Sequence, residues 1–248
     1  MRSEPVPASR RRRRSHARLP LGLLAIFVIG LIVALVVASP SFRSRDGFSD
    51  IPEGHPYQAG ILDLSDRSII DGYDDGSFRP DDPVIRQQFA KMIVKALDYP
   101  VSAGDLCPFG DVPKSVPGSY LDPSDRDYPD HYVAVCAAHG ITVGTTSNTF
   151  APYDSITHQQ LITMLVRAVA LADPPSDYTP PFSEDDFYPR EHYLNARRAA
   201  HVGLLAGLQG MGPTYDFQAD STRGECAQIL YNLLVWLEHG ATELAFQL

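Results

Sequence analysis

The chain has 248 residues, three cysteines and a formal net charge of −9. This length allows one or two domains. From residue 40 onward, 14 Lys and Arg stand against 29 Asp and Glu, a net charge of −15. This acidic balance argues against a nucleic-acid binder, because phosphate backbones are bound mainly by Lys and Arg.

The first 38 residues predict a segment separate from the globular part. Residues 1–18 form a basic tail with seven arginines, and residues 19–38 then run without a charge. Twenty such residues can span a hydrocarbon core as a transmembrane helix. Because arginines stay on the cytoplasmic side, the sequence predicts a single-pass protein of the cell membrane with its C-terminal bulk outside the cytoplasm. A cleaved signal peptide, leaving a secreted and wall-bound protein, is the alternative.

A helix–turn–helix pattern then occurs three times, after a linker at 39–47. The repeats are expected at 48–99, 107–172 and 182–239, with a loose or docking tail at 240–248. The first helix of each repeat is expected near 56–67, 130–139 and 189–205. The second helix is expected near 84–98, 156–172 and 221–239. The turns between them carry the structural glycines Gly72, Gly76, Gly144 and Gly207, since glycine supplies backbone freedom there.

Each second helix carries one apolar stripe. Aligned on Arg86, His158 and Arg223, apolar residues recur at offsets of 3, 6, 7, 10 and 11, which is one face of an α-helix. A helix pair cannot bury such a stripe alone, so three pairs must share a core. The sequence therefore predicts an all-α domain with almost no strand.

These motifs resemble the S-layer homology (SLH) domain family over about residues 46–238. The family pattern is an F-x-D start, a first helix ending in G-I-x-x-G-Y, a D-G-x-F-x-P loop and I-T-R-A-E at the second helix. Repeat 1 matches through Phe48, Asp50, Gly72, Tyr73, Phe78 and Arg86, among others. Repeat 2 matches through Phe109, Asp111, Gly144, Phe150 and Thr157, and repeat 3 through Phe182, Gly207, Phe217, Thr222, Arg223 and Glu225. The resemblance implies a pseudo-threefold bundle of three repeats that binds an acidic cell-wall polysaccharide, often one capped by pyruvyl ketal.

In this family the arginine of I-T-R-A-E meets the glycan, and Arg86 and Arg223 hold that place. A guanidinium binds a carboxylate through two parallel hydrogen bonds, and a nearby helix N-terminus also favours anions. His158 holds the place in repeat 2, although a neutral imidazole cannot replace an always-charged guanidinium. A salt bridge to Asp50 or Asp111 in another repeat is the alternative role of the arginines.

For two further pairs of residues, two threonines and two cysteines, the sequence allows more than one role. Thr157 and Thr222 precede the basic residues and are glycan-binding candidates, although capping the helix is the favoured role of Thr222. Cys107 and Cys136 both belong to repeat 2, where a disulfide and two unpaired thiols are both open in an oxidising compartment.

No pattern of residues indicates catalysis, a metal site or a cofactor, because G-x-S-x-G and H-E-x-x-H are both absent. The sequence predicts a non-catalytic protein that links the membrane, through residues 19–38, to a wall polysaccharide. The alternative is an extracytoplasmic protein-interaction module that has lost glycan binding, which the incomplete motifs of repeats 1 and 2 favour.

Overall fold

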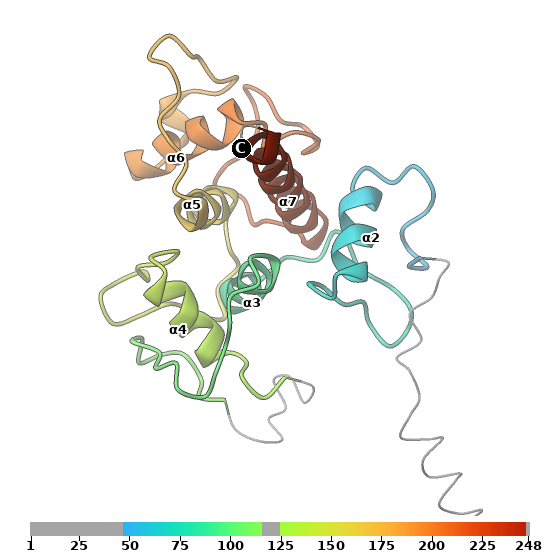
Figure 1. Ribbon diagram of the computed structural model, residues 1–248, viewed down its shortest axis with the longest axis vertical. Coiled ribbons are helices and arrows are strands. Elements are labelled where there is room, and N and C mark those ends of the chain that lie inside the picture. The colour runs from blue at the N-terminus through green and yellow to red at the C-terminus, as the bar shows by residue number, and fades with distance from the viewer. Residues whose placement is uncertain (1–46, 116–124, 247–248) are drawn as a thin grey trace, which may run out of the picture. The chain divides into compact units, whose positions relative to one another are not determined.

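The computed structural model describes residues 47–115 and 125–246. The chain divides into Met1–Arg45 and Asp46–Leu248, and the described helices belong to the second unit. The predicted basic tail, transmembrane helix and most of the linker lie outside the described residues. Within the described ranges the structure consists of helices and loops without a strand, as the predicted all-α class requires (Figure 1). None of the described helices combines the length and apolar character that a bilayer crossing needs.

Each repeat contributes a first and a second helix. The first helices are α2 (Gln58–Asp66), α4 (Asp130–Ala138) and α6 (Arg190–His201), the last preceded by the 3-10 turn η1 (Glu184–Asp186). The second helices are α3 (Arg86–Ala96), α5 (His158–Val169) and α7 (Arg223–Phe246). Helices α3 and α5 begin two residues later than predicted, because Ile85 and Thr157 have extended backbones and precede the first helical turn.

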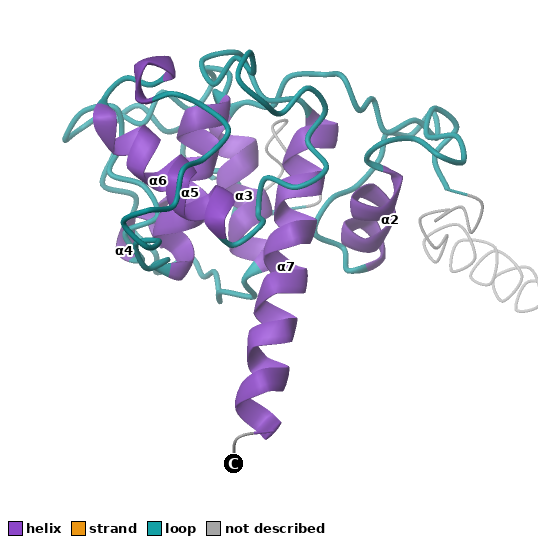
Figure 2. Ribbon diagram, turned by 90° about the horizontal axis from the view of Figure 1, so that it is seen from above, coloured by secondary structure: helices purple, strands orange, loops and turns teal. Residues whose placement is uncertain are grey.

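Helix α7 runs past its predicted end near residue 239 and continues to Phe246 (Figure 2). Residues 241–248 include two Ala, two Leu and one Glu, which have high helix propensity. Most of the expected tail is therefore part of this helix.

The two helices of one repeat do not pack on each other in the way that the repeat pattern suggests. Instead, α4 packs on α3, α6 packs on α5, and α2 packs on α7 (Figure 1). Each first helix thus covers the second helix of the preceding repeat, and the contact between α2 and α7 closes the circle. Periodicity identified the buried faces, but it carried no information about which helix would cover them.

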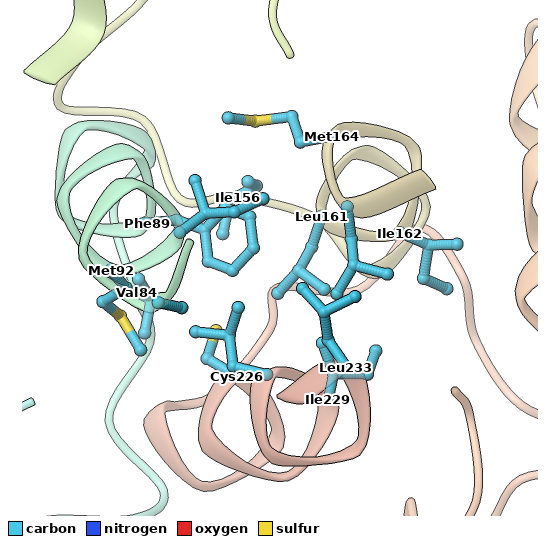
Figure 3. Close-up of a cluster of buried hydrophobic side chains, with 14 of the residues drawn as sticks. Val84, Phe89, Met92, Ile156, Leu161, Ile162, Met164, Cys226, Ile229 and Leu233 are labelled. Carbon is cyan, nitrogen blue, oxygen red and sulfur yellow. The ribbon is translucent and has the colours of Figure 1, made fainter. Parts of the chain in front are cut away.

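The three second helices surround a common hydrophobic core (Figure 3). The first stripe position of each helix is fully or almost fully buried, at Phe89, Leu161 and Cys226. A fully buried side chain of this size contributes about 1.5–3 kcal/mol to stability. The predicted stripe is therefore the centre of the domain.

Three backbone hydrogen bonds join the segments that lead into these helices. Val84 N donates to Ser221 O (3.0 Å), Ser221 N donates to Ile156 O (2.8 Å), and Ile156 N donates to Val84 O (2.8 Å). Since all three residues are buried, every one of these polar groups needs an internal partner. The closed ring supplies those partners, and it brings the N-termini of α3, α5 and α7 together.

The hydroxyl of Ser221 destabilises the fold, because Ser221 is 0% exposed and its Oγ has no hydrogen-bond partner. The equivalent residues of the ring, Val84 and Ile156, are apolar. A buried unpaired hydroxyl costs about 1–3 kcal/mol. We expect Ser221→Ala to raise the free energy of unfolding by about 1 kcal/mol in urea denaturation. Ser147→Ala, at an exposed turn residue, is the control and should change nothing.

The predicted turn glycines are needed for two different reasons. Gly76, Gly144 and Gly207 have positive φ, between 78° and 81°, as expected. Gly72 does not have a positive φ; a Cβ there would collide with the ring of Phe48. The requirement at Gly72 is therefore close packing with the aromatic residue that opens the repeat.

Candidate functional site

The contact between a second helix and the turn of the next repeat is called a junction here. At each of the three junctions, the first backbone N–H of the second helix donates across to that turn. Arg86 N donates to Asp154 O, His158 N to Ala219 O and Arg223 N to Asp82 O, at 2.9–3.1 Å. First-turn N–H groups have no partner within their own helix. The junctions satisfy them with carbonyl groups from the neighbouring turn.

Arg86, at the repeat 1–2 junction, is only 5% exposed. Its Nε donates to Phe150 O (2.8 Å) and its Nη1 donates to Gln160 Oε1 (3.1 Å). The guanidinium also lies over the Phe150 ring, 4.7 Å from the centroid. Burial lowers the pKa of Arg86, but an arginine stays protonated in proteins. Arg86 therefore braces the turn of repeat 2 and presents little surface to a ligand.

Arg223, at the repeat 3–1 junction, makes the equivalent contact and is less deeply buried. Its Nε donates to Phe78 O (2.8 Å) and its Nη2 donates to Asp71 O (2.9 Å). Both acceptors are neutral backbone carbonyls. Burial lowers the pKa of Arg223 as well, and the side chain keeps its charge. Among the described residues no carboxylate forms an ion pair with this guanidinium.

The repeat 3–1 junction also has an exposed aromatic residue, which was not expected from the sequence to contact a ligand. Tyr73 is 39% exposed, and its ring lies 5.1 Å from the Arg223 guanidinium. Arg79 stacks over the same ring at 3.9 Å and pairs with Asp75 at 3.0 Å. The sequence signal was the tyrosine of the G-Y motif, which only repeat 1 retains.

His158, at the repeat 2–3 junction, has a carboxylate partner. Its Nδ1 lies 2.8 Å from Asp216 O and its Nε2 lies 2.9 Å from Glu225 Oε2. Burial lowers the pKa of His158, but the hydrogen bond and charge of Glu225 and the Asp216 carbonyl outweigh it, so the pKa is raised. The charge at this junction is therefore neutralised internally.

Salt bridges to Asp50 or Asp111, the alternative role of the arginines, are not among the ion pairs of the described residues. Asp50 instead accepts backbone hydrogen bonds from Phe78 N (2.7 Å) and Arg79 N (2.6 Å). Asp111 accepts equivalent bonds from Phe150 N (2.8 Å) and Ala151 N (2.7 Å). These carboxylates thus accept hydrogen bonds from the turns of their own repeats. The two arginines donate to backbone carbonyl groups instead.

The two threonine candidates differ. Thr222 Oγ1 accepts a hydrogen bond from Glu225 N (3.3 Å), which is the capping role favoured from the sequence. Thr157 Oγ1 is buried without a hydrogen-bond partner, so it does not reach the surface.

The cysteines adopt the second of the two predicted alternatives. Cys107 and Cys136 are both free thiols. The Cys136 thiol is 0% exposed and donates to Ala90 O (3.6 Å), whereas the Cys107 thiol faces Phe109 O (3.8 Å). Their side chains are thus directed to different carbonyl groups. Residues 47–115 and 125–246 contain no group of three His, Cys, Asp or Glu residues that could hold a metal ion.

Comparison with known proteins matches two parts of this chain to one family. Residues 47–90 and 127–162 match the S-layer homology domain. The S-layer protein EA1 of Bacillus anthracis is 25% identical over 207 residues, covering 82% of this chain and 22% of that protein. The S-layer protein of Bacillus licheniformis is 26% identical over 206 residues, again covering 82% of this chain and 22% of the relative.

An enzyme is also among the similar proteins. An endoglucanase of Bacillus sp. (strain KSM-635) is 29% identical over 155 residues, covering 59% of this chain and 15% of the enzyme. The chain thus matches about a fifth of the length of these relatives, or less. The two matched segments contain the Phe48 and Phe78 motifs of repeat 1 and the Phe150 loop of repeat 2. These two segments of the chain therefore match S-layer homology domains.

Proposed function

We propose that this protein binds an acidic cell-wall polysaccharide outside the cytoplasm, without catalysis, and links the membrane to the wall. In this proposal repeats 48–99, 107–172 and 182–239 are all SLH repeats, related by an approximate threefold axis. Residues 1–18 are cytoplasmic and residues 19–38 hold the membrane, with cleavage and secretion as the alternative. The ring of hydrogen bonds through Val84, Ile156 and Ser221 supports this arrangement, because each repeat contributes the same element to it.

The observation that carries the proposal is that Arg223 lies beside an exposed tyrosine and forms no ion pair with a carboxylate of the described residues. Its guanidinium uses two carbonyl groups, and neither cancels its charge. A carboxylate on a sugar, such as that of a pyruvyl ketal, is the complementary group. The exposed part of the Tyr73 ring, beside the stacked Arg79 guanidinium, offers apolar surface to a sugar. An arginine is needed here because the exported part of the chain is acidic as a whole.

The other two junctions are less suited to an anionic ligand. Arg86 is almost completely buried, and the residues equivalent to Tyr73 and Arg79 in repeat 2 are Thr145 and Ala151. His158 is neutralised by Glu225. We therefore assign the ligand contact to the repeat 3–1 junction and not to all three.

The test is cosedimentation of the full chain with purified wall sacculi. We expect Arg223→Gln to weaken binding about 10–100-fold, because a hydrogen bond to a charged group contributes about 1.5–3 kcal/mol. Tyr73→Ala should also weaken binding, while it leaves both Arg223 hydrogen bonds in place. Arg190→Gln is the control, since Arg190 is an exposed arginine of repeat 3 that pairs with Glu184. Circular dichroism and thermal unfolding check that each variant is folded.

Two results would contradict the proposal. One is equal binding by the native chain, Arg223→Gln and Tyr73→Ala. The other is binding that survives chemical removal of the wall polysaccharide, which would favour the protein-interaction alternative.

A further inference from the structure

The contacts of His158 require both of its ring protons. Nδ1 lies 2.8 Å from the Asp216 carbonyl oxygen, and Nε2 lies 2.9 Å from Glu225 Oε2. A carbonyl and a carboxylate are both acceptors, so each ring nitrogen must donate. Only the imidazolium form carries a proton on both nitrogens. His158 is 8% exposed, so water cannot readily replace either partner.

The surroundings of His158 keep Glu225 ionised. Glu225 Oε2 also accepts a hydrogen bond from Thr222 N (2.9 Å), and Oε1 accepts one from the Tyr215 hydroxyl (3.3 Å). The Tyr215 ring lies 4.7 Å from the His158 ring, and burial raises the pKa of Tyr215, so this residue stays neutral. The Asp216 carboxylate bonds the N–H of Gln218 in its own turn (2.9 Å). The junction is thus a buried imidazolium–carboxylate pair.

This pair shares one helical turn with the proposed ligand site. Arg223 and Glu225 both belong to the first turn of α7. Glu225 holds that turn against repeat 2 through His158, and Arg223 holds it against repeat 1 through Phe78 O. A displacement at Glu225 therefore moves the backbone from which the Arg223 side chain extends.

We infer that His158 and Glu225 are positioning residues for the Arg223 site, and that they hold it only while His158 carries both ring protons. Loss of one proton leaves Glu225 as a buried carboxylate without its cation and leaves one acceptor of His158 without a donor, and both changes weaken the junction. The role of Arg223 as a ligand site rests on the proposed function, whereas the effect of His158 protonation on the position of Arg223 does not depend on a ligand.

The sign of the pH dependence follows from the two partners. The raised pKa of His158 means that its contribution to stability is complete below about pH 6.5 and is lost as the pH rises through the higher folded value. Burial raises the pKa of Glu225, but His158 and the Thr222 N–H outweigh it, so the pKa is lowered. Its contribution is complete above about pH 4.5 and is lost as the pH falls through the lower folded value. Both contributions are therefore complete between about pH 4.5 and pH 6.5, where the junction is most stable.

The chain itself supplies a matched variant. The repeat 1–2 junction has Arg86 and Gln160 in the places of His158 and Glu225, and these two side chains are hydrogen bonded. The double variant His158→Arg, Glu225→Gln copies that junction without a group that titrates near neutral pH. Between about pH 6 and pH 9 we expect the Tm of the native full chain to fall by about 2–4 °C more than that of the double variant.

His192→Gln controls for a half-buried imidazole that also contacts α5, through its Nδ1, which lies 2.6 Å from Thr163 Oγ1. This variant should retain the fall in Tm with rising pH and make it slightly steeper, because burial lowers the pKa of His192, so the native residue gains stability as the pH rises. Equal slopes in the native chain and the double variant would overturn the inference.

A second measurement follows Arg223 directly, without a ligand. In 15N NMR of the full chain, the Arg223 Nε–H signal should shift with pH at the midpoint of the His158 ring signals. It should not shift in the double variant. Titration of His158 with an unchanged Arg223 signal would overturn the positioning role. Binding to sacculi at about pH 6 reports separately on the proposed function, since its absence leaves both pH measurements interpretable.

Discussion

Asp111→Ala is expected to lower the free energy of unfolding by about 2–4 kcal/mol, since each hydrogen bond to a charged group contributes about 1.5–3 kcal/mol. The Asp111 carboxylate binds the N–H groups of Phe150 and Ala151. Ala151 has a φ of 58°, which is unfavourable for a residue with a Cβ. The carboxylate thus holds the turn in a conformation that the turn alone does not prefer. Asp50 holds Arg79, with a φ of 59°, in the same way.

Repeat 3 offers the control for this prediction. Glu184 occupies the place of Asp50 and Asp111, but its carboxylate pairs with Arg190 at 2.6 Å and does not cap the turn. Glu184→Ala should therefore leave the urea midpoint unchanged, because exposed ion pairs contribute little. Equal losses in Asp111→Ala and Glu184→Ala would show that the carboxylates do not act through the turns.

Arg86→Ala is expected to cost about 3 kcal/mol of stability. The substitution removes the donors to Phe150 O and Gln160 Oε1, and it leaves a cavity where the guanidinium covered the Phe150 ring. Arg86→Lys should recover little of this loss, because the single nitrogen of an ammonium group cannot replace both Nε and Nη1, which donate to two separate acceptors. Urea unfolding should show a lower midpoint with an unchanged m-value.

The control for Arg86 is Arg190→Ala. Both arginines are the first residue of a helix, but Arg190 is exposed and pairs with Glu184 in its own repeat. No measurable loss is expected for Arg190. If Arg86→Ala were equally harmless, the arginine would have no bracing role, and the tight packing of the repeat 1–2 junction would need another cause.

Features that depend on local pattern could be predicted from the sequence. The 3.6-residue period placed Phe89, Leu161 and Cys226 in the core, and the turn motifs placed the starts of the second helices within two residues. The period does not predict which two helices pack together, because one apolar face can pack against any other apolar face of complementary shape. That choice depends on packing between repeats and appeared only in the structure.

The partners of the candidate site residues depend on contacts between distant parts of the chain. Arg86 reaches a carbonyl 64 positions away and Arg223 reaches one 145 positions away, so neither contact leaves a local signal. From the sequence, a ligand or a carboxylate was the expected partner of each arginine. A backbone carbonyl was not expected, since any residue supplies one. The pair of His158 and Glu225 was missed for the same reason.

The crossed packing of the helices has a consequence for shortened forms of this protein. A chain that ended after α5 would lack α6 and α7, which are the helices that cover α5 and α2. Such a fragment would be an open arc with an uncovered apolar face at each end, and not a smaller closed body. All three repeats are therefore needed to close the circle, because α2 of the first repeat is covered only when α7 of the third repeat is present.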